Sequence, residues 1–139
     1  MPSSYTFSND TARIDRDRVH SWLSEQSYWA NGRAREVQDA AIDGSRNYGV
    51  WDSSGMQVAY ARVVTDAVTF AWLCDVFVDE EARGNGIGKM LVEGVISDLQ
   101  PLGLTRMLLA TADAHGLYAQ YGFAPSDDPT RYMIKQMRP

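Results

Sequence analysis

The order of apolar and polar residues divides the chain into ten predicted elements. Alternating or continuous apolar runs predict strands at residues 4–8, 47–52, 56–65, 67–78, 105–111 and 131–137. Apolar residues that repeat every three or four positions predict helices over residues 15–26, 34–43, 87–99 and 113–122. In chain order these elements read β-α-α-β-β-β-α-β-α-β. This order indicates a mixed α/β or α+β sheet with helices on both faces.

Composition narrows the class of protein. The chain has 139 residues, of which 45% are hydrophobic, and this predicts one globular domain over residues 1–139. Cys74 is the single cysteine, so an internal disulfide and a zinc site built on cysteines are excluded, and no metal is expected. The net charge of −5 argues against nucleic acid as the main partner. No run approaches the ~20 apolar residues that span a bilayer, and the polar N-terminus has no signal core, so we expect no membrane contact and a cytoplasmic location.

Three glycines stand between the apolar run at 67–78 and the helix predicted at 87–99. Gly84, Gly86 and Gly88 would let backbone N–H groups and a helix start point at an anion, with Arg83 and Lys89 on either side. A tight surface turn would explain the same residues.

Two well-known phosphate-binding patterns do not fit this segment. In a Walker A loop the Gly-Lys pair precedes Ser or Thr, and here Met90 follows Lys89. A dinucleotide fingerprint reads Gly-x-Gly-x-x-Gly after the first strand, whereas here the glycines alternate late in the chain. An ATP- or NAD-binding module is therefore disfavoured.

A third pattern fits the segment. The sequence RGNGIG resembles the acyl-CoA-binding loop of the GNAT superfamily of N-acetyltransferases, with Arg83, Gly86 and Gly88 at its specified positions. The stretch HGLYAQYGF at 115–123 is similar to a second segment of that family. The element order agrees along nearly the whole chain.

The resemblance implies a fold and an activity. The fold is a mixed, mostly antiparallel sheet of six to seven strands flanked by about four helices. The activity is direct transfer of an acetyl group from acetyl-CoA to a primary amine of a small molecule or peptide. A non-catalytic CoA-binding sensor or regulatory module is the alternative. Homodimers are common in the family, and a homodimer is compatible with this sequence.

The resemblance also assigns cofactor contacts. It places the pantetheine arm of the cofactor against the main chain of Val76, Phe77 and Val78. It places the pyrophosphate on the N–H groups of Arg83, Gly84, Asn85, Gly86, Ile87, Gly88 and Lys89. A side chain at Gly86 or Gly88 would then occupy the space of a phosphate or of the adjoining strand.

Two residues are candidates for catalysis. Tyr118 matches the family's general acid, which would protonate the leaving thiolate; the alternative is a tyrosine that only packs in the core. Asp75 is a lone carboxylate in an apolar run, so it is either the base that deprotonates the amine or a partner in an ion pair with Arg62. Strand alternation predicts that Asp75 lies beside Leu73 and Phe77 and faces away from Cys74, which gives little support to a covalent route.

Other positions near these candidates are less informative. Thr111 stands where many family members carry Asn, and it is assigned no role. His115 could contact the cofactor or shuttle a proton, or it could be a surface residue. The loop at 27–33 offers Tyr28, Trp29 and Arg33 to an amine acceptor, together with Arg62 from a neighbouring strand. The plain alternative is that Trp29 fills the core and the arginines face water.

Overall fold

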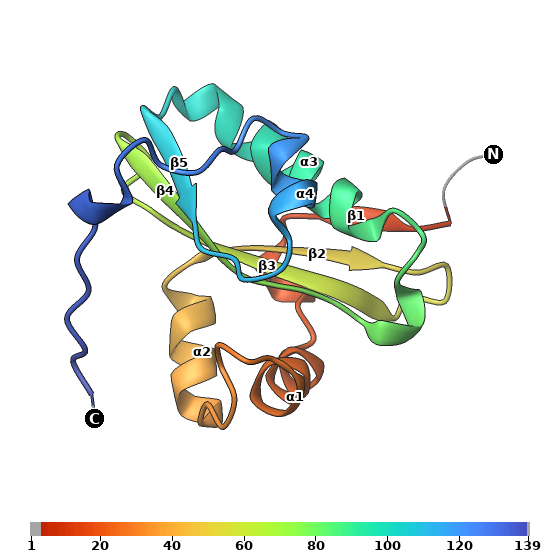
Figure 1. Ribbon diagram of the computed structural model, residues 1–139. Helices are drawn as coiled ribbons and strands as arrows, with labels where there is room; N and C mark the ends of the chain where they lie inside the picture. Colours follow the sequence, from red (N-terminus) through yellow and green to blue (C-terminus); the bar gives the residue numbers. More distant parts are fainter. Residues whose placement is uncertain (1–3, 139) are drawn as a thin grey trace.

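A five-stranded sheet forms the centre of the molecule. The computed structural model describes residues 4–138. The sheet order follows the chain (Figure 1): β1 (Thr6–Ser8), β2 (Arg46–Trp51), β3 (Gln57–Thr65), β4 (Phe70–Val78) and β5 (Arg106–Leu109). Strands β1 to β4 pair with one another in antiparallel orientation, and β5 runs parallel to β4. The predicted mixed, mostly antiparallel sheet is therefore confirmed.

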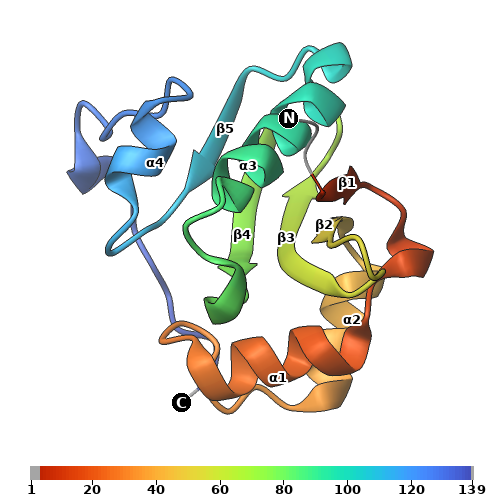
Figure 2. The same cartoon turned by 90° about the vertical axis from the view of Figure 1, so that its right-hand side faces the viewer.

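Helices cover both faces of the sheet, as the sequence predicted. One face carries α1 (Arg16–Gln26) and α2 (Arg35–Asp43), and the other carries α3 (Ile87–Leu99) and α4 (His115–Ala119), as Figures 1 and 2 show from two directions. Short 3-10 turns follow or precede these elements at Thr11–Arg13, Glu80–Ala82, Gln100–Leu102 and Pro129–Arg131.

The apolar stripe of each long helix builds one of two cores. On α1 the buried residues Val19, Trp22 and Leu23 pack in a cluster that also contains Phe77 of β4. On α3 the buried residues, Ile87, Leu91, Val92, Val95 and Leu99, pack in a larger cluster on the opposite face. Burial of these side chains is the main force that holds both helix layers to the sheet.

Strand β4, the fourth of the five, contains a bulge at Asp75. Phe77 pairs with Tyr60 and Cys74 pairs with Arg62, so two residues of β4 lie opposite the single residue between Tyr60 and Arg62. Asp75 has a φ of +55°, in the left-handed region that non-glycine residues rarely adopt. The bulge changes which side chains share a face: Leu73 lies in the α3 core and Phe77 in the α1 core. The prediction that Asp75 lies beside both residues is therefore wrong.

The bulge coincides with the point where β4 and β5 separate. The parallel pairing extends from Phe70 to Leu73 on β4, while β4 itself continues to Val78. Among the described residues, no strand pairs with this outer edge of β4 beyond Leu73. On the side of β5, the backbone N–H and C=O groups of β4 beyond Leu73 consequently have no strand partner within residues 4–138.

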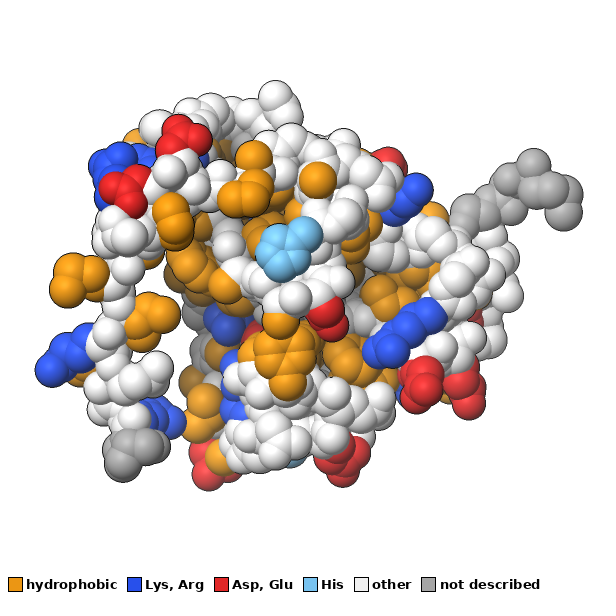
Figure 3. Space-filling view, in the orientation of Figure 1, with side chains coloured by type: hydrophobic (Ala, Val, Ile, Leu, Met, Phe, Trp, Pro, Cys, Tyr) orange, Lys and Arg blue, Asp and Glu red, His pale blue; other side chains and the backbone are white. Residues whose placement is uncertain are grey.

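The last predicted strand is absent. Residues 131–137 continue from the turn at Pro129–Arg131 without joining the sheet, so the described sheet has five strands rather than six to seven. The physical reason is that this segment does not run along the open outer edge of β5, where its backbone could form a ladder. It stands apart from the body of the molecule and carries apolar side chains into solvent (Figure 3).

Candidate active site

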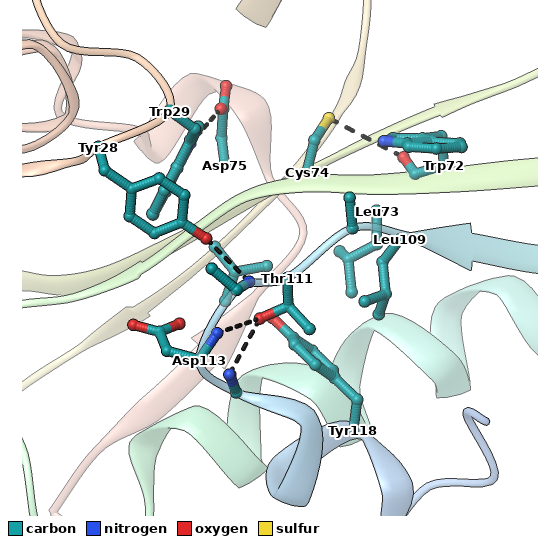
Figure 4. Close-up of a pocket in the computed structure, with 14 residues that line it drawn as sticks. Tyr28, Trp29, Trp72, Leu73, Cys74, Asp75, Leu109, Thr111, Asp113 and Tyr118 are labelled. Atoms are coloured by element: carbon teal, nitrogen blue, oxygen red, sulfur yellow. Dashed lines mark hydrogen bonds between the residues drawn. The ribbon is translucent and has the colours of Figure 1, made fainter. Parts of the chain in front are cut away.

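Two cavities meet beside Tyr118. The first, which we call the aromatic cleft, has a volume of about 440 Å³, and the second, the glycine groove, has a volume of about 430 Å³. Both are lined by Val76, Ala114 and Tyr118. The groove is completed by Val78, Arg83, Gly84, Gly86, Ile87, Gly88, Lys89 and Leu117. The cleft is completed by Tyr28, Trp29, Trp72, Leu73, Cys74, Asp75, Leu109, Ala110, Thr111, Ala112 and Asp113 (Figure 4).

Backbone geometry forms the glycine groove. Gly84 and Gly86 have φ values of +87° and +74°, which a residue with a side chain adopts only at a cost. Helix α3 begins directly after Gly86, with no side-chain cap and no acidic residue in its first turn. Its first N–H groups and the positive end of its dipole are therefore available to an anion.

Two cations flank the groove, and neither is neutralised within residues 4–138. Arg83 and Lys89 line the groove, and no described carboxylate forms a salt bridge with either side chain. The Nε of Arg83 donates to the carbonyl of Val78 at 3.0 Å, which fixes the arginine against the end of β4. The groove thus combines a helix start with positive side chains, the combination that binds phosphate groups.

Most of the predicted loop residues line the groove, but two predicted residues point elsewhere. Asn85 turns its amide back to the carbonyl of Ala82 at 2.8 Å, so its side chain holds the loop instead of lining the cavity. Phe77 packs on Trp22 in the α1 core, with ring centroids 5.5 Å apart. Any contact that these two residues make to a ligand in the groove would come from their main chain.

Gly88 has a different neighbour from the one predicted. A Cβ added there would meet a methyl group of Leu117 on α4 at 3.5 Å, an ordinary contact, and not an adjoining strand. At Gly84 and Gly86 an added Cβ would meet no atom within 4 Å. As far as the protein's own described atoms are concerned, the requirement for glycine at these two positions is therefore conformational rather than steric.

Tyr118 lies between the two cavities, and its hydroxyl keeps its proton at neutral pH. It is 7% exposed, and its ring meets Phe123 edge-on at 5.9 Å. Burial, with smaller contributions from Asp113 and Tyr28, raises the pKa of Tyr118 to about 12. Within residues 4–138 no group forms a hydrogen bond with its hydroxyl, so the phenol stays protonated at neutral pH and remains available to a ligand.

Asp75 is the centre of a buried ion-pair network. Its Oδ2 accepts from Arg33 at 2.8 Å and from Arg62 at 2.9 Å, and its Oδ1 accepts from the indole N–H of Trp29 at 3.0 Å. The side chain of Asp75 is 1% exposed. Burial by itself would raise the pKa of Asp75, but the hydrogen bond from Arg33 and the charges of both arginines lower it below its usual range.

The ion pair to Arg62, which the sequence suggested as one alternative, is thus present, and Arg33 joins it. A carboxylate with a lowered pKa and occupied oxygens is a weak proton acceptor. This geometry suits an anchor for the surrounding side chains better than a base.

The aromatic cleft joins loops that are far apart in the sequence. Tyr28 and Trp29, in the loop between α1 and α2, meet edge-on at 4.9 Å and are partly exposed. The hydroxyl of Tyr28 accepts from the N–H of Ala112 at 3.0 Å, which ties this loop to the one between β5 and α4. The alternative that Trp29 fills the core is wrong, because the ring lines the cleft while its N–H binds Asp75.

Sequence reasoning missed several residues of the cleft. Trp72 and Cys74 line it, although alternation predicted that Cys74 would face away from Asp75. The bulge explains the error, because it places Cys74 opposite Arg62, on the same face as the ion-pair network. Burial raises the pKa of the Cys74 thiol, so the sulfur is held in its less nucleophilic form. A bulge at a non-glycine residue gives no sequence signal that could have revealed this arrangement.

Thr111, His115 and Asp113 lie at the start of α4. Thr111 accepts from the N–H groups of Asp113 and Ala114, at 3.4 and 3.0 Å, so it shapes this helix start. His115 is exposed and lines neither cavity. Asp113 lines the cleft and, among the described residues, makes no salt bridge.

Residues 4–138 contain neither a membrane-spanning helix nor a cluster of metal ligands. None of their helices is long and apolar enough to cross a membrane. No group of three or more His, Cys, Asp or Glu side chains in this range is arranged to hold a metal ion.

Known proteins resemble the chain in sequence and in structure. A sequence profile of the acetyltransferase (GNAT) family matches residues 16–123. Serotonin N-acetyltransferase 2, chloroplastic, from Oryza sativa subsp. japonica is 35% identical over 82 residues, which make up 58% of this chain and 41% of that protein. The chain thus spans less than half the length of this relative. The cytoplasmic location stays a prediction, since the rice protein is named for the chloroplast.

Two solved structures share the fold. A crystal structure from Xanthomonas campestris pv. campestris, described as belonging to the GNAT family, has a TM-score of 0.91 and 42% identity, covering 99% of this chain and 95% of that one. N-acetylglutamate synthase from Neisseria gonorrhoeae, complexed with coenzyme A and N-acetyl-glutamate, has a TM-score of 0.69 and 14% identity, covering 87% of this chain and 28% of that one. With the family profile matching most of its length, the chain belongs to the acetyltransferase (GNAT) family.

Proposed function

We propose that the chain is an acetyl-CoA-dependent N-acetyltransferase that passes the acetyl group directly to a primary amine of a small molecule or peptide. The observation that supports this proposal is the meeting of the glycine groove and the aromatic cleft at Tyr118. Two substrates that bind in separate cavities can react only where those cavities join. Tyr118 lies at this junction and carries a proton that a leaving group needs.

The glycine groove fits the diphosphate of acetyl-CoA. The open space beside Gly84 and Gly86, the start of α3 and the charges of Arg83 and Lys89 favour a ligand with several negative charges. The edge of β4 beyond Leu73 offers unpaired backbone groups, to which the amides of a pantetheine arm could bind. When bound there, acetyl-CoA supplies the thioester from which the amine takes the acetyl group.

Tyr118 acts as the general acid in this proposal. The neutral amine nitrogen forms its bond to the acetyl carbon while the carbon–sulfur bond breaks, and the sulfur leaves as a thiol with the proton of Tyr118. The surplus proton on the new amide nitrogen then passes through water to the Tyr118 phenolate, which restores the acid. A free thiol titrates near ~8.5, so a phenol with a pKa of about 12 is the weaker acid in isolation. The same burial that raises the pKa of Tyr118 also disfavours a thiolate beside it, which reduces this mismatch.

The aromatic cleft receives the amine. Tyr28 and Trp29 offer ring surfaces to apolar or cationic groups, and Asp113 adds one unpaired carboxylate to the wall. Asp75 acts as a positioning residue that fixes Trp29, Arg33 and Arg62. Because both arginines already share one carboxylate, they are less available to an acidic acceptor than the sequence suggested.

The test combines a panel of amines with substitution of the proposed acid. Tyr118→Phe should lower kcat by about 10²-fold or more, because proton donation in the transition state contributes at least that much. The affinity for acetyl-CoA, measured by calorimetry, should not change. Tyr121→Phe is the matched control, because the Tyr121 hydroxyl binds Glu93 at 2.9 Å and lines neither cavity.

Three results would argue against the proposal. Full turnover by Tyr118→Phe would remove the acid assignment. Binding of acetyl-CoA without thiol release on any amine would favour the non-catalytic sensor. Absence of acetyl-CoA binding would remove the cofactor assignment.

A further inference from the structure

The charged side chains that line the aromatic cleft are all negative. Among the described residues, Asp75 and Asp113 bring a charge to its wall, and no Lys or Arg does. The oxygens of Asp75 are occupied by Arg33, Arg62 and Trp29, and its side chain is 1% exposed. Asp113 is exposed, and no group within residues 4–138 forms a hydrogen bond or salt bridge with its carboxylate. The cleft therefore offers a ligand one free negative charge and no positive one.

Aromatic rings share the cleft with this carboxylate. Tyr28, Trp29 and Trp72 line it and are 61%, 42% and 38% exposed. Tyr28 is tied to the neighbourhood of Asp113, because its hydroxyl accepts from the N–H of the preceding residue, Ala112, at 3.0 Å (Figure 4). Ring faces and a carboxylate together attract an ammonium group. This part of the cleft therefore has the composition of a site for a cation.

The reacting nitrogen of the amine is a poor partner for Asp113. A carboxylate stabilises the charged form of a nearby amine and so raises the pKa of that amine. The nitrogen that attacks the thioester must be neutral, so a carboxylate beside it would oppose the proposed reaction. The carboxylate of Asp113 stands apart from the hydroxyl of Tyr118, and no hydrogen bond joins them (Figure 4). Asp113 is thus placed to hold a second basic group, away from the nitrogen that reacts.

We infer, on the basis of the proposed function, that the acceptor is a small diamine and that Asp113 selects it. One amine lies neutral beside Tyr118, and the other, charged, lies between Asp113 and the rings of Tyr28 and Trp29. The net charge of −5 attracts such a substrate over longer distances. An acceptor with a carboxylate in place of the second amine would meet a like charge at Asp113 and no free cation in the cleft, so it is disfavoured.

Three probes of matched length test this inference. Putrescine, pentylamine and δ-aminovalerate each carry a primary amine on a chain of methylene groups of the same length, and the far end bears an ammonium, a methyl group or a carboxylate. For the wild type, kcat/KM should be highest for putrescine and lowest for δ-aminovalerate. A second ammonium also lowers the pKa of the first amine, so this ranking does not by itself assign the preference to Asp113.

Substitution of Asp113 makes that assignment. Asp113→Asn keeps the size of the side chain and removes its charge, so it should raise KM for putrescine about five- to tenfold and leave KM for pentylamine unchanged. Loss of the charge also acts on Tyr118, but that effect should change kcat for both amines alike. Asp113→Lys should reverse the ranking, so that δ-aminovalerate becomes a better acceptor than putrescine.

Asp127→Asn is the matched control. Asp127 is exposed and lines neither cavity, and its substitution changes the net charge of the chain by the same amount. KM for putrescine should stay at the wild-type value. An equal rise in Asp127→Asn and Asp113→Asn would overturn the inference, because net charge would then explain the preference.

Calorimetry separates a failure of this inference from a failure of the proposed function. Asp113→Asn should raise the Kd of putrescine, measured in the presence of coenzyme A, by the same factor as KM. Thiol release with both amines and an unchanged KM for putrescine in Asp113→Asn would overturn the diamine inference and leave the proposed function standing. Absence of thiol release with every amine would remove the proposed function, and the Kd of putrescine would then decide the inference alone. Putrescine that does not bind the wild type, or that binds Asp113→Asn equally well, would overturn it.

Discussion

The glycine groove and the aromatic cleft have similar volumes but are built in opposite ways. The groove is lined mainly by residues of one continuous segment, from Val76 to Lys89, and its character comes from backbone conformation and a helix start. The cleft draws on three segments that are far apart in the chain, and side chains decide its shape. A contiguous backbone site can be recognised from its sequence, whereas an assembled side-chain site depends on how distant elements meet.

Among the substitutions that test this contrast between the two cavities, the largest loss of stability should come from breaking the ion-pair network behind the cleft. Asp75→Asn keeps the size of the side chain and tolerates a φ of +55°, but it leaves Arg33 and Arg62 without their carboxylate. Breaking a buried ion pair in this way should lower the free energy of unfolding by about 3–5 kcal/mol, measured by urea denaturation. If stability hardly changes, the network does not hold the cleft wall.

A surface ion pair provides the control for Asp75→Asn. Asp39→Asn removes one of the two acidic partners of Arg16 and of Arg35 on the surface of α2 and should change stability little. The pH dependence gives an independent check. Because the pKa of Asp75 is lowered in the folded state, its stabilising contribution is complete above the unfolded value near ~3.9 and is lost as the pH falls below it. Asp75→Asn should therefore lose less stability between neutral pH and acid than the wild type does.

A smaller effect is expected in the groove. Gly86→Ala places a side chain at a φ of +74°, which should cost about 1–2 kcal/mol and distort the loop that we propose holds the diphosphate. Acetyl-CoA affinity should fall roughly tenfold, which corresponds to about 1.4 kcal/mol. The amine specificity should not change, because Gly86 does not line the cleft.

Gly55 offers a matched control for the groove. It has a φ of +89° in the turn between β2 and β3, and, as at Gly86, an added Cβ would meet no atom within 4 Å. Gly55→Ala should lower stability by a similar amount and leave acetyl-CoA affinity intact. Equal losses of affinity in both variants would mean that the effect is general rather than local to the groove.

The smallest effect should come from Trp29→Phe. This change keeps an aromatic wall but removes the indole N–H that donates to Asp75 at 3.0 Å. A hydrogen bond to a charged group contributes about 1.5–3 kcal/mol. Water can replace most of it at this partly exposed position, so the net loss should stay below that of Gly86→Ala. We expect a higher KM for the amine at unchanged acetyl-CoA affinity. A change confined to acetyl-CoA affinity would place Trp29 in the wrong cavity.

The contrast between the cavities also explains which predictions succeeded. The sheet class, the helices on both faces and the helix after the glycines follow from periodicity, which depends only on neighbours in sequence. That Tyr28 and Trp29 face a cavity was one of two alternatives that their loop left open, and the structure places both in the wall of the aromatic cleft. The faces of Leu73, Phe77 and Cys74 were not, because strand alternation assumes a regular strand and the bulge at Asp75 interrupts it.

The C-terminal segment shows a second limit of sequence patterns. Residues 131–137 alternate as a strand does, yet a strand needs a neighbour, and the sequence does not say where that neighbour is. In the described chain it has none, and five strands form the sheet.

The proposed reaction is tested most directly by a crystal structure of the chain with both products bound. These are coenzyme A and the N-acetylated form of an amine that the panel shows to be a substrate. We expect the diphosphate on the N–H groups of residues 84–89 and the sulfur beside the Tyr118 hydroxyl. We also expect the amine portion of the product between Trp29 and Asp113. Coenzyme A bound outside the glycine groove, or a sulfur that does not reach Tyr118, would contradict the central claim that the two cavities join one reaction at this residue.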